Sequence, residues 1–184
     1  VGRRQNFGGT TQNGLDGACK AVTVIFARGT TEAGNVGSLV GPPFFQALAT
    51  AIGADKLSVQ GVDYPADIPG FLAGGDGNGS KKMAELITTA MIKCPNTKVV
   101  MSGYSQGGQL VHNAAKLLPA ATTAKIAAAV IFGDPSQGDA VQGVPASKTR
   151  VFCNLSDNIC SGGILVLPAH LTYGVQNAAE ASAF

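Results

Sequence analysis

A serine enclosed by glycines follows directly on an apolar run, and this arrangement constrains the fold more than any other feature. The segment reads VVMSGYSQGGQL, in which Gly103, Ser105 and Gly107 form the pattern G-x-S-x-G. Residues 99–101 are typical of a buried strand, and residues 109–118 are typical of a helix. A strand, a sharp turn and a helix are the context of a nucleophile elbow, whose tight turn leaves no room for bulky neighbours. We therefore expect Ser105 to stand at the carboxyl end of a strand as a candidate nucleophile.

Apolar runs alternate with helix-like segments along the rest of the chain. Residues 21–27 (AVTVIFA) form a continuous apolar run, which is typical of a strand buried on both faces. Further strands are expected at residues 57–62, 125–135 and 149–155, and further helices at residues 41–53, at residues 80–93 starting from Ser80, and from Val175 onward. This alternation predicts an α/β fold with a parallel sheet covered by helices on both faces.

Length and composition limit the class of protein. A chain of 184 residues suits one domain, which we expect at residues 18–184, while the polar and glycine-rich residues 1–17 suggest a flexible N-terminal arm. Charged residues make up 13% of the chain, against roughly 25% in an average protein, and the formal net charge is only +2. The apolar run at residues 126–132 is far too short to span a bilayer. We therefore expect neither nucleic-acid binding nor stable membrane insertion.

The four cysteines indicate an oxidising environment. Cys19, Cys94, Cys153 and Cys160 include no C-x-x-C pair, and the chain has only two histidines, so disulfides are favoured over a zinc site. The chain opens VGRRQNF without an apolar segment, which is typical of a mature secreted protein whose signal peptide has been removed. Two N-x-S sequons, one of them at Asn78 and the other at position 154, are compatible with this interpretation.

A serine hydroxyl needs a neutral imidazole to take its proton. His112 lies seven residues after Ser105 on the expected helix, about 10 Å away along the axis, and is interpreted as a surface or groove histidine. His170 follows ILVLPA in a segment without helical periodicity, so a loop there could place it over the turn. The chain order in α/β-hydrolases is serine, acid, histidine, and this order favours His170 as the base.

The imidazole in turn needs a carboxylate between Ser105 and His170 in the sequence. The candidates are Asp134, Asp139 and Asp157. Asp157 follows a strand and lies between two cysteines, where a rigid loop would hold the carboxylate in place. Asp134 also ends a strand, but an aspartate before proline is often only a turn former. Asp157 is therefore the favoured acid, and Asp134 is the second choice.

An acyl-transfer site also needs hydrogen-bond donors for the developing oxyanion. The first expected donor is the backbone N–H of Gln106, the residue after the nucleophile. The second is expected from the segment FARGTTEAGN, where the strand ends near Ala27 and Thr30 lies in the following turn. The hydroxyl of Thr30 could add a third donor, although a threonine here could also be an ordinary turn or cap residue.

Five segments together resemble the fungal cutinases. They read IFARGTTEAGN, KCPNTKVV, GYSQGG, VFCNLSDNIC and LPAHLTYG, and they cover most of the chain from residue 19 to about residue 174. The resemblance implies an α/β-hydrolase fold without a lid, a three-layer sandwich around a central parallel sheet of about five strands. It also implies a catalytic triad, an oxyanion hole and two disulfides, formed by Ser105, Asp157 and His170, by Thr30 and Gln106, and by the pairs Cys19–Cys94 and Cys153–Cys160.

Some residues depart from the cutinase pattern. The oxyanion position is usually a serine in cutinases, and here it is Thr30. The double glycine after the serine motif and the segment FGDPSQGD are similar to acetylxylan esterases, although those enzymes are richer in cysteine and lack an apolar loop such as GGILVLPAH. We therefore expect a secreted serine esterase of the cutinase type. An acetylxylan-esterase-like deacetylase is the alternative, and a non-catalytic binding protein on the same fold is a remote one.

Two apolar loops suggest the substrate. Residues 64–72 and 162–171 carry many large apolar side chains, and the second loop leads directly into His170. Some of these side chains must pack on the core, but an exposed apolar rim would attract an acyl chain or a polymer segment. By resemblance to cutinases, Ile164, Val166 and Leu171 would flank the acyl chain, with Phe71 or Leu72 opposite. Tyr64, from the first apolar loop, is added to the expected substrate contacts. We expect a monomer that hydrolyses cutin-like aliphatic polyesters and short- to medium-chain esters without a metal ion or organic cofactor.

Overall fold

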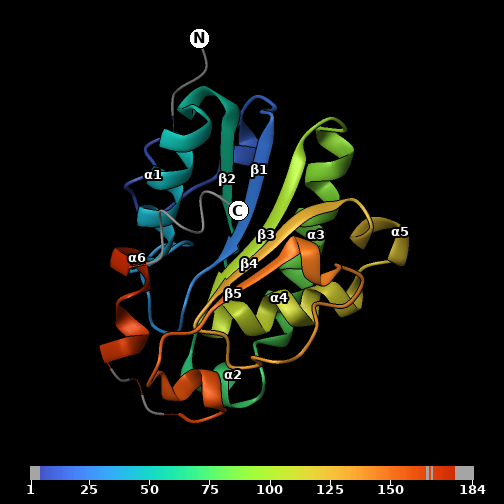
Figure 1. Ribbon diagram of the computed structural model, residues 1–184. Helices are drawn as coiled ribbons and strands as arrows, with labels where there is room; N and C mark the ends of the chain where they lie inside the picture. The colour runs from blue at the N-terminus through green and yellow to red at the C-terminus, as the bar shows by residue number, and fades with distance from the viewer. Residues whose placement is uncertain (1–4, 165, 167, 177–184) are drawn as a thin grey trace.

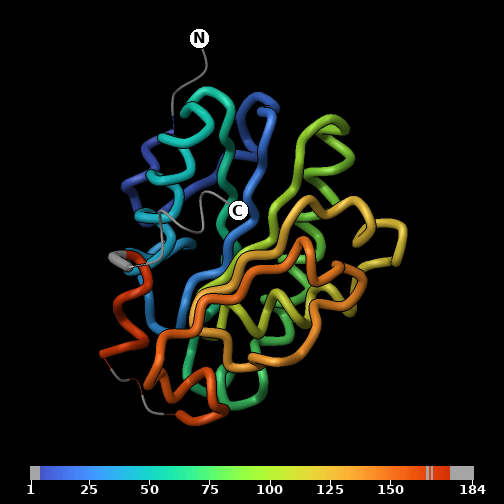
Figure 2. The backbone as a smooth tube through the Cα atoms, in the orientation of Figure 1, coloured from blue at the N-terminus to red at the C-terminus, as the bar shows by residue number. Residues whose placement is uncertain are grey.

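Five parallel strands form the centre of the protein in a computed structural model that describes residues 5–164, 166 and 168–176. The strand order is β2-β1-β3-β4-β5, and all four neighbouring pairs are parallel. In Figure 2 the blue trace of β1 and the green-to-orange traces of β3, β4 and β5 run side by side although they come from distant parts of the chain. The strands are β1 (Val22–Ala27), β2 (Leu57–Gly61), β3 (Lys98–Tyr104), β4 (Ile126–Phe132) and β5 (Thr149–Phe152).

Helices cover both faces of this sheet, so the three-layer α/β-hydrolase sandwich is confirmed (Figure 1). One face carries α1 and α6, and the other carries α3 and α4. The α-helices are α1 (Gly41–Ile52), α2 (Ile68–Leu72), α3 (Gly77–Lys93), α4 (Gln106–Leu117), α5 (Ala120–Thr123) and α6 (Tyr173–Gln176). Single 3-10 turns lie at η1 (Gly14–Asp16), η2 (Ala54–Lys56), η3 (Ala146–Lys148), η4 (Asn158–Ser161) and η5 (Pro168–Leu171).

Side-chain alternation along β1 explains why every residue of this strand except Thr23 is apolar. Val24 and Phe26 face α1, where the ring of Phe26 meets that of Phe45 edge-on at 5.1 Å between centroids. Ile25 and Ala27 face the opposite core, which α3 and α4 cover. A strand buried on both faces cannot show a polar alternation. In the described residues, no helix is long and apolar enough to cross a membrane.

Two boundaries differ from the sequence-based expectation. The helix expected to start at Ser80 begins at Gly77, because the carboxylate of Asp76 accepts a hydrogen bond from the backbone N–H of Gly79 at 2.6 Å and caps the helix earlier. The glycine- and proline-rich residues 63–80 suggest a loop, but they contain the short helix α2, whose cap is the carboxylate of Asp67. The helix expected from Val175 onward is described only as far as α6, and the rest of that prediction lies outside the described residues.

Residues 5–17 are not the loose arm that their composition suggested. The side chain of Gln5 donates to the carbonyl of Val59 at 2.9 Å and accepts from its N–H at 3.0 Å, so one amide pairs with the edge strand β2 as a neighbouring strand would. The carbonyl of Gln12 accepts from the N–H of Gly61 at 2.9 Å, and Phe7 is buried against the α1 side of the sheet. The expectation of a flexible arm is therefore wrong for these residues, and residues 1–4 lie outside the described part.

Both disulfides join the cysteines that the resemblance paired. The bridge Cys19–Cys94 connects the segment before β1 to the end of α3, over a sequence separation of 75 residues. The bridge Cys153–Cys160 closes a loop directly after β5, with a separation of only 7 residues. The second bridge therefore limits the movement of whatever lies inside this short loop.

Candidate active site

Ser105 lies in a sharp turn between β3 and α4, as the nucleophile-elbow pattern predicts. Its backbone has a φ of 58° and a ψ of −117°, a conformation that residues other than glycine rarely adopt. The flanking glycines allow the turn, because a Cβ atom on Gly103 would lie 2.3 Å from the backbone of Gly107, and one on Gly107 would lie 2.0 Å from the carbonyl oxygen of Ala27. The strained turn places the serine at the amino end of α4, in the wall of a cavity.

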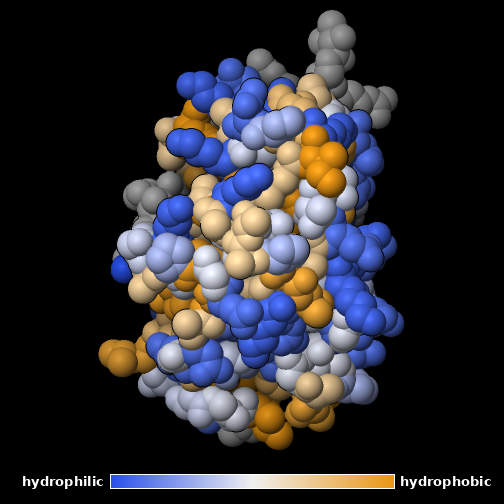
Figure 3. All heavy atoms as spheres, turned by 90° about the vertical axis from the view of Figure 1, so that its right-hand side faces the viewer, coloured by the Kyte–Doolittle hydropathy of each residue, from blue (hydrophilic) through white to orange (hydrophobic). Residues whose placement is uncertain are grey.

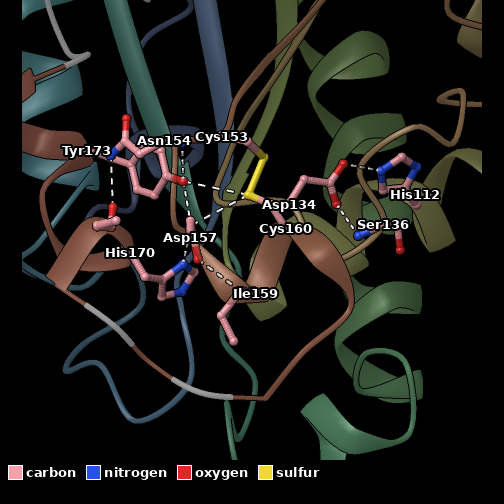
Figure 4. Close-up of a disulfide and its surroundings, with 11 residues drawn as sticks. His112, Asp134, Ser136, Cys153, Asn154, Asp157, Ile159, Cys160, His170 and Tyr173 are labelled. Carbon is pink, nitrogen blue, oxygen red and sulfur yellow. Dashed lines mark hydrogen bonds and ion pairs between the residues drawn. A yellow bond between two sulfur atoms is a disulfide. The ribbon is translucent and has the colours of Figure 1, made fainter.

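His170 and Asp157 form a buried pair beside this turn (Figure 4). His170 Nδ1 lies 2.8 Å from Asp157 Oδ2, and the two residues are only 2% and 3% exposed. The other carboxylate oxygen accepts from the N–H of Ile159 at 3.0 Å, inside the loop that Cys153–Cys160 closes. The structure thus brings together the histidine and the aspartate that the sequence favoured.

The imidazole of His170 is held from several sides. Tyr104 donates its hydroxyl to the carbonyl of His170 at 2.6 Å, and its ring stacks on the imidazole with centroids 5.0 Å apart. Gly133, which directly follows β4 and has a φ of 59°, lies next to the imidazole ring. A Cβ atom on Gly133 would lie 2.7 Å from His170 Cε1, so only glycine leaves room for the ring in this position.

Tyr173 contacts the same aspartate from α6. Its hydroxyl donates a short hydrogen bond to Asp157 Oδ2 and accepts one from the N–H of Asn154 at 2.9 Å. Burial and the hydrogen bond to Asp157 both raise the pKa of Tyr173 above its ordinary value, so the phenol stays protonated and remains a donor. No motif in the sequence pointed to Tyr173, although it lies only three residues after His170.

Gln106 and Thr30, the two residues expected to supply oxyanion donors, are in contact with each other. The side-chain amide of Gln106 donates to Thr30 Oγ1 at 2.9 Å and to the carbonyl of Asp67 at 2.9 Å. Gln106 is fully buried, so this amide is a fixed link between the loop after β1 and the start of α2. Because Thr30 Oγ1 accepts this bond, its own proton is left to point in another direction.

Glu32 organises the loop that carries Thr30, and the sequence analysis did not single it out. Its carboxylate accepts from the N–H groups of Gly29, Leu39 and Ser38 at 2.8, 3.0 and 3.3 Å. Burial raises the pKa of Glu32, and these hydrogen bonds together with Arg28 oppose that rise. The residue that shapes this loop is therefore itself a half-buried acid in the cavity wall.

A cavity of about 610 Å³ joins these groups to a largely apolar rim. Ser105, His170 and Thr30 line it together with five of the six expected substrate contacts, namely Phe71, Leu72, Ile164, Val166 and Leu171. Leu39, Ile68 and Ile159 add to the apolar wall. Ile164 is 67% exposed, Leu72 62% and Val166 60%, so the rim presents apolar side chains to solvent. Figure 3 shows hydrophobic side chains gathered at the lower end of the molecule, the end at which Figure 1 places α2. The described rim therefore offers apolar surface around the serine.

Tyr64 does not line this cavity, so that expectation is corrected. Its side chain turns inward and is only 5% exposed, and its hydroxyl donates to the carbonyl of Arg28 at 2.6 Å. The guanidinium of Arg28 lies over its ring, 4.9 Å from the centroid. Tyr64 thus belongs to the core on the α3 and α4 side and packs on the residue that follows β1, which a position at the start of an apolar loop could not reveal.

A second buried His–Asp pair lies on the other side of the Cys153–Cys160 disulfide in Figure 4. His112 Nε2 lies 2.7 Å from Asp134 Oδ2, and the two residues are 4% and 0% exposed. His112 is therefore not the surface or groove histidine that was expected, because its side chain turns inward from α4 onto Asp134. Asp134, the second choice for the acid, is paired with His112, and Asp139 lies exposed in a turn. Within the described residues, no cluster of three or more metal-ligating side chains is found.

Comparison with known proteins agrees with this geometry. The sequence matches the family model described as Cutinase over residues 18–184. It is 63% identical over 165 residues to the cutinase of Botryotinia fuckeliana, which covers 90% of this chain and 82% of the relative, and 61% identical to that of Monilinia fructicola with the same coverage.

Solved structures show the same relationship. The structure of Trichoderma reesei cutinase in complex with a phosphonate inhibitor is 50% identical, with a TM-score of 0.90 over 95% of this chain and 78% of that one. An acetylxylan esterase structure, 24% identical with a TM-score of 0.69 over 90% of this chain and 97% of that one, shares the fold. The chain therefore belongs to the cutinase family and is a serine carboxylic ester hydrolase.

Proposed function

We propose that Ser105, His170 and Asp157 form the catalytic triad. Asp157 engages Nδ1 of the imidazole, which leaves Nε2 to take the proton of the serine hydroxyl. The serine oxygen then attacks the ester carbonyl, and His170 passes the proton to the leaving alcohol. Water hydrolyses the acyl-enzyme in a second step in which His170 acts again as base and then as acid. The supporting observation is that Ser105 and His170 line one cavity, while Asp157 holds the imidazole from behind this lining.

The oxyanion hole is assigned to Gln106 and Thr30. The backbone N–H of Gln106 begins α4, where it is not needed for helix pairing. The side-chain amide of Gln106 donates a hydrogen bond to Thr30 Oγ1, so the threonine proton is free to be donated to the developing oxyanion. Two segments distant in sequence thus supply donors that are fixed before the substrate arrives.

The proposed substrates are aliphatic polyesters such as cutin, and short- to medium-chain esters. The observation that carries this proposal is the apolar rim formed by Leu72, Ile164 and Val166, which stays exposed around the serine. Covering such a rim with an acyl chain releases about 25 cal/mol for each Å² of apolar surface buried. A deacetylase of acetylated polysaccharide would need polar groups at this rim instead. The assembled His–Asp pair argues against a non-catalytic binding protein.

The two disulfides and the cutinase relatives support the proposal of an extracellular enzyme, since disulfides persist in oxidising environments. We further propose that it acts as a monomer. An open, apolar rim suits contact with an insoluble polymer rather than with a second copy of the chain.

The triad is tested by labelling with an organophosphonate ester. We expect stoichiometric modification at Ser105, found by peptide mass spectrometry, and complete loss of p-nitrophenyl butyrate hydrolysis in Ser105→Ala. An active Ser105→Ala variant would overturn the proposal. The substrate class is tested separately by comparing polycaprolactone and hexanoate esters with acetylxylan. Activity on acetylxylan alone would replace the polyester assignment and leave the triad intact.

A further inference from the structure

We propose that Tyr173 is a positioning residue of the catalytic acid, which makes the working unit a chain of four residues: Ser105, His170, Asp157 and Tyr173. The inference rests on the proposed triad. It comes from one feature of the geometry, since the tyrosine hydroxyl and the histidine ring both bond to the same oxygen of Asp157.

The carboxylate of Asp157 is fully engaged. Oδ1 accepts from the N–H of Ile159, while Oδ2 faces both His170 Nδ1 and the hydroxyl of Tyr173 (Figure 4). The Asp157 and His170 side chains are more than nine-tenths buried, and Tyr173 is fully buried. With three donors around it, the carboxylate is held in one orientation.

The direction of the tyrosine hydroxyl is fixed. The N–H of Asn154 can only donate, so the phenol oxygen is the acceptor in that contact and its own proton points to Asp157. The ring is equally confined, since it packs edge-on against Tyr104 at 6.2 Å and Phe132 at 6.3 Å. Cys160 Sγ lies 3.6 Å from the same hydroxyl, but a disulfide sulfur is a weak acceptor and the contact with Asp157 is much shorter. Tyr173 is therefore a confined donor whose proton is directed at the carboxylate.

Sharing one oxygen has a chemical consequence. The hydroxyl of Tyr173 takes up part of the negative charge on Oδ2, so this oxygen stabilises the imidazolium of His170 less than an unshared one would. Without the hydroxyl, the whole carboxylate charge would face the imidazole and would attract the positively charged ring more strongly. The carboxylate would also lose one of the groups that orient it. The same change thus alters the electrostatic balance at His170 and weakens its alignment.

The alternative is that Tyr173 only fills the core. The chain offers a matched series for this question, because it contains three tyrosines and all three are buried with the hydroxyl donating to one acceptor. Tyr64 donates to the carbonyl of Arg28 away from the cavity, and Tyr104 donates to the carbonyl of His170. Only Tyr173 donates to the catalytic carboxylate. Each Tyr→Phe change removes one buried hydroxyl and nothing else.

The experiment measures kcat, KM, the pH dependence of kcat/KM on p-nitrophenyl butyrate, and the melting temperature for Y64F, Y104F and Y173F. For Y173F we expect kcat to fall about fivefold, the effect of one buried hydrogen bond, with KM unchanged. We also expect the acidic limb of its profile to move up by about half a pH unit. Y64F should lower the melting temperature and keep the acidic limb of the wild type. An unmoved limb in Y173F, or an equal shift in Y64F, would overturn the inference.

A second measurement places the effect at Asp157. In an Asp157→Asn background the target of the hydroxyl has changed, so Tyr173→Phe should reduce kcat less than it does in the wild type. A full fivefold loss in that background would show that Tyr173 acts elsewhere and would also overturn the inference. Labelling of Ser105 and the activity of Ser105→Ala test the triad independently, so a failure here is distinguishable from a failure of the proposed triad.

Discussion

Replacement of Gly133 by alanine should disable the enzyme by displacing His170, although no residue of the proposed triad is itself replaced. A Cβ atom at position 133 would lie 2.7 Å from His170 Cε1 and 2.8 Å from Nδ1. Ordinary carbon contacts lie near 3.5 to 4.0 Å, so the imidazole must move by about 1 Å. The ring cannot move freely, because Tyr104 stacks on it and Asp157 bonds to Nδ1.

The expected loss in kcat follows from this displacement. A misplacement of about 1 Å in a catalytic group can cost about 100-fold in rate. The positive φ of 59° adds a backbone penalty of roughly 1 to 2 kcal/mol for alanine, which should lower the melting temperature by several degrees. We therefore expect an enzyme that folds, is less stable, and turns over p-nitrophenyl butyrate about 100-fold more slowly.

Gly138→Ala is the matched control for this substitution. Gly138 has a φ of 96°, but a Cβ atom there would meet nothing within 4 Å. This variant should therefore lose stability for the same backbone reason and keep its kcat. The assay is steady-state hydrolysis at a temperature well below both melting points. Wild-type kcat in a folded Gly133→Ala variant would refute the reasoning, and so would an equal loss of kcat in Gly138→Ala.

Four further predictions follow from the described contacts. Thr30→Val should lower kcat by about 100-fold while Thr30→Ser should retain most of it, because only the hydroxyl serves the oxyanion; equal kcat values in the two variants would exclude this role. His112→Ala should lower the free energy of unfolding by about 3 to 5 kcal/mol, because it leaves the buried carboxylate of Asp134 unpaired, and the folded fraction should keep its kcat; a denaturation curve and an active-site titration check both parts. Burial raises the folded-state pKa of Glu32, so its contribution to stability is present below its ordinary pKa of 4.5 and is lost as pH rises through the raised value. Glu32→Gln should flatten this loss of stability when urea unfolding is measured at a series of pH values, and an unchanged pH dependence would contradict the assignment. Loss of Cys19–Cys94 in a double serine variant should cost about 4 kcal/mol by chain entropy, measured by denaturant unfolding, whereas four titratable thiols in the unreduced wild type would show that the bridges are absent.

The sheet and the serine turn could be predicted because their signals are local. The run at residues 21–27 is almost entirely apolar since residues 23–27 are buried on both faces of the sheet, and the glycines around Ser105 are required by close backbone contacts at the turn. Residues 5–17 could not be predicted in the same way. Their order comes from Gln5 and Gln12 pairing with β2, and a polar side chain does not reveal whether its partner is water or a distant backbone group.

The direction of single side chains was also beyond the sequence. Tyr64 and Phe71 belong to the same apolar stretch, yet Tyr64 packs on Arg28 while Phe71 lines the cavity. The role of Glu32 in holding the loop that carries Thr30 could not be predicted for a related reason. Its carboxylate accepts hydrogen bonds from backbone N–H groups, which nearly every residue has, so the types of the neighbouring residues do not indicate the contact.

The order of residues along the chain could predict which histidine pairs with Asp157, but the partner of Asp134 became known only from the fold. Asp134 and Asp157 follow neighbouring parallel strands, β4 and β5, whose carboxyl ends share one edge of the sheet, so both carboxylates lie near the serine turn. Their partners come from opposite layers. His112 reaches Asp134 from α4, whereas His170 approaches between Tyr104 and Tyr173 on the α1 side. The end of β4 contributes to both pairs, since Gly133 supports the ring of His170 while the next residue binds His112. A substitution at this strand end should therefore affect rate or stability according to the layer that its side chain faces, a distinction that spacing along the chain could not provide.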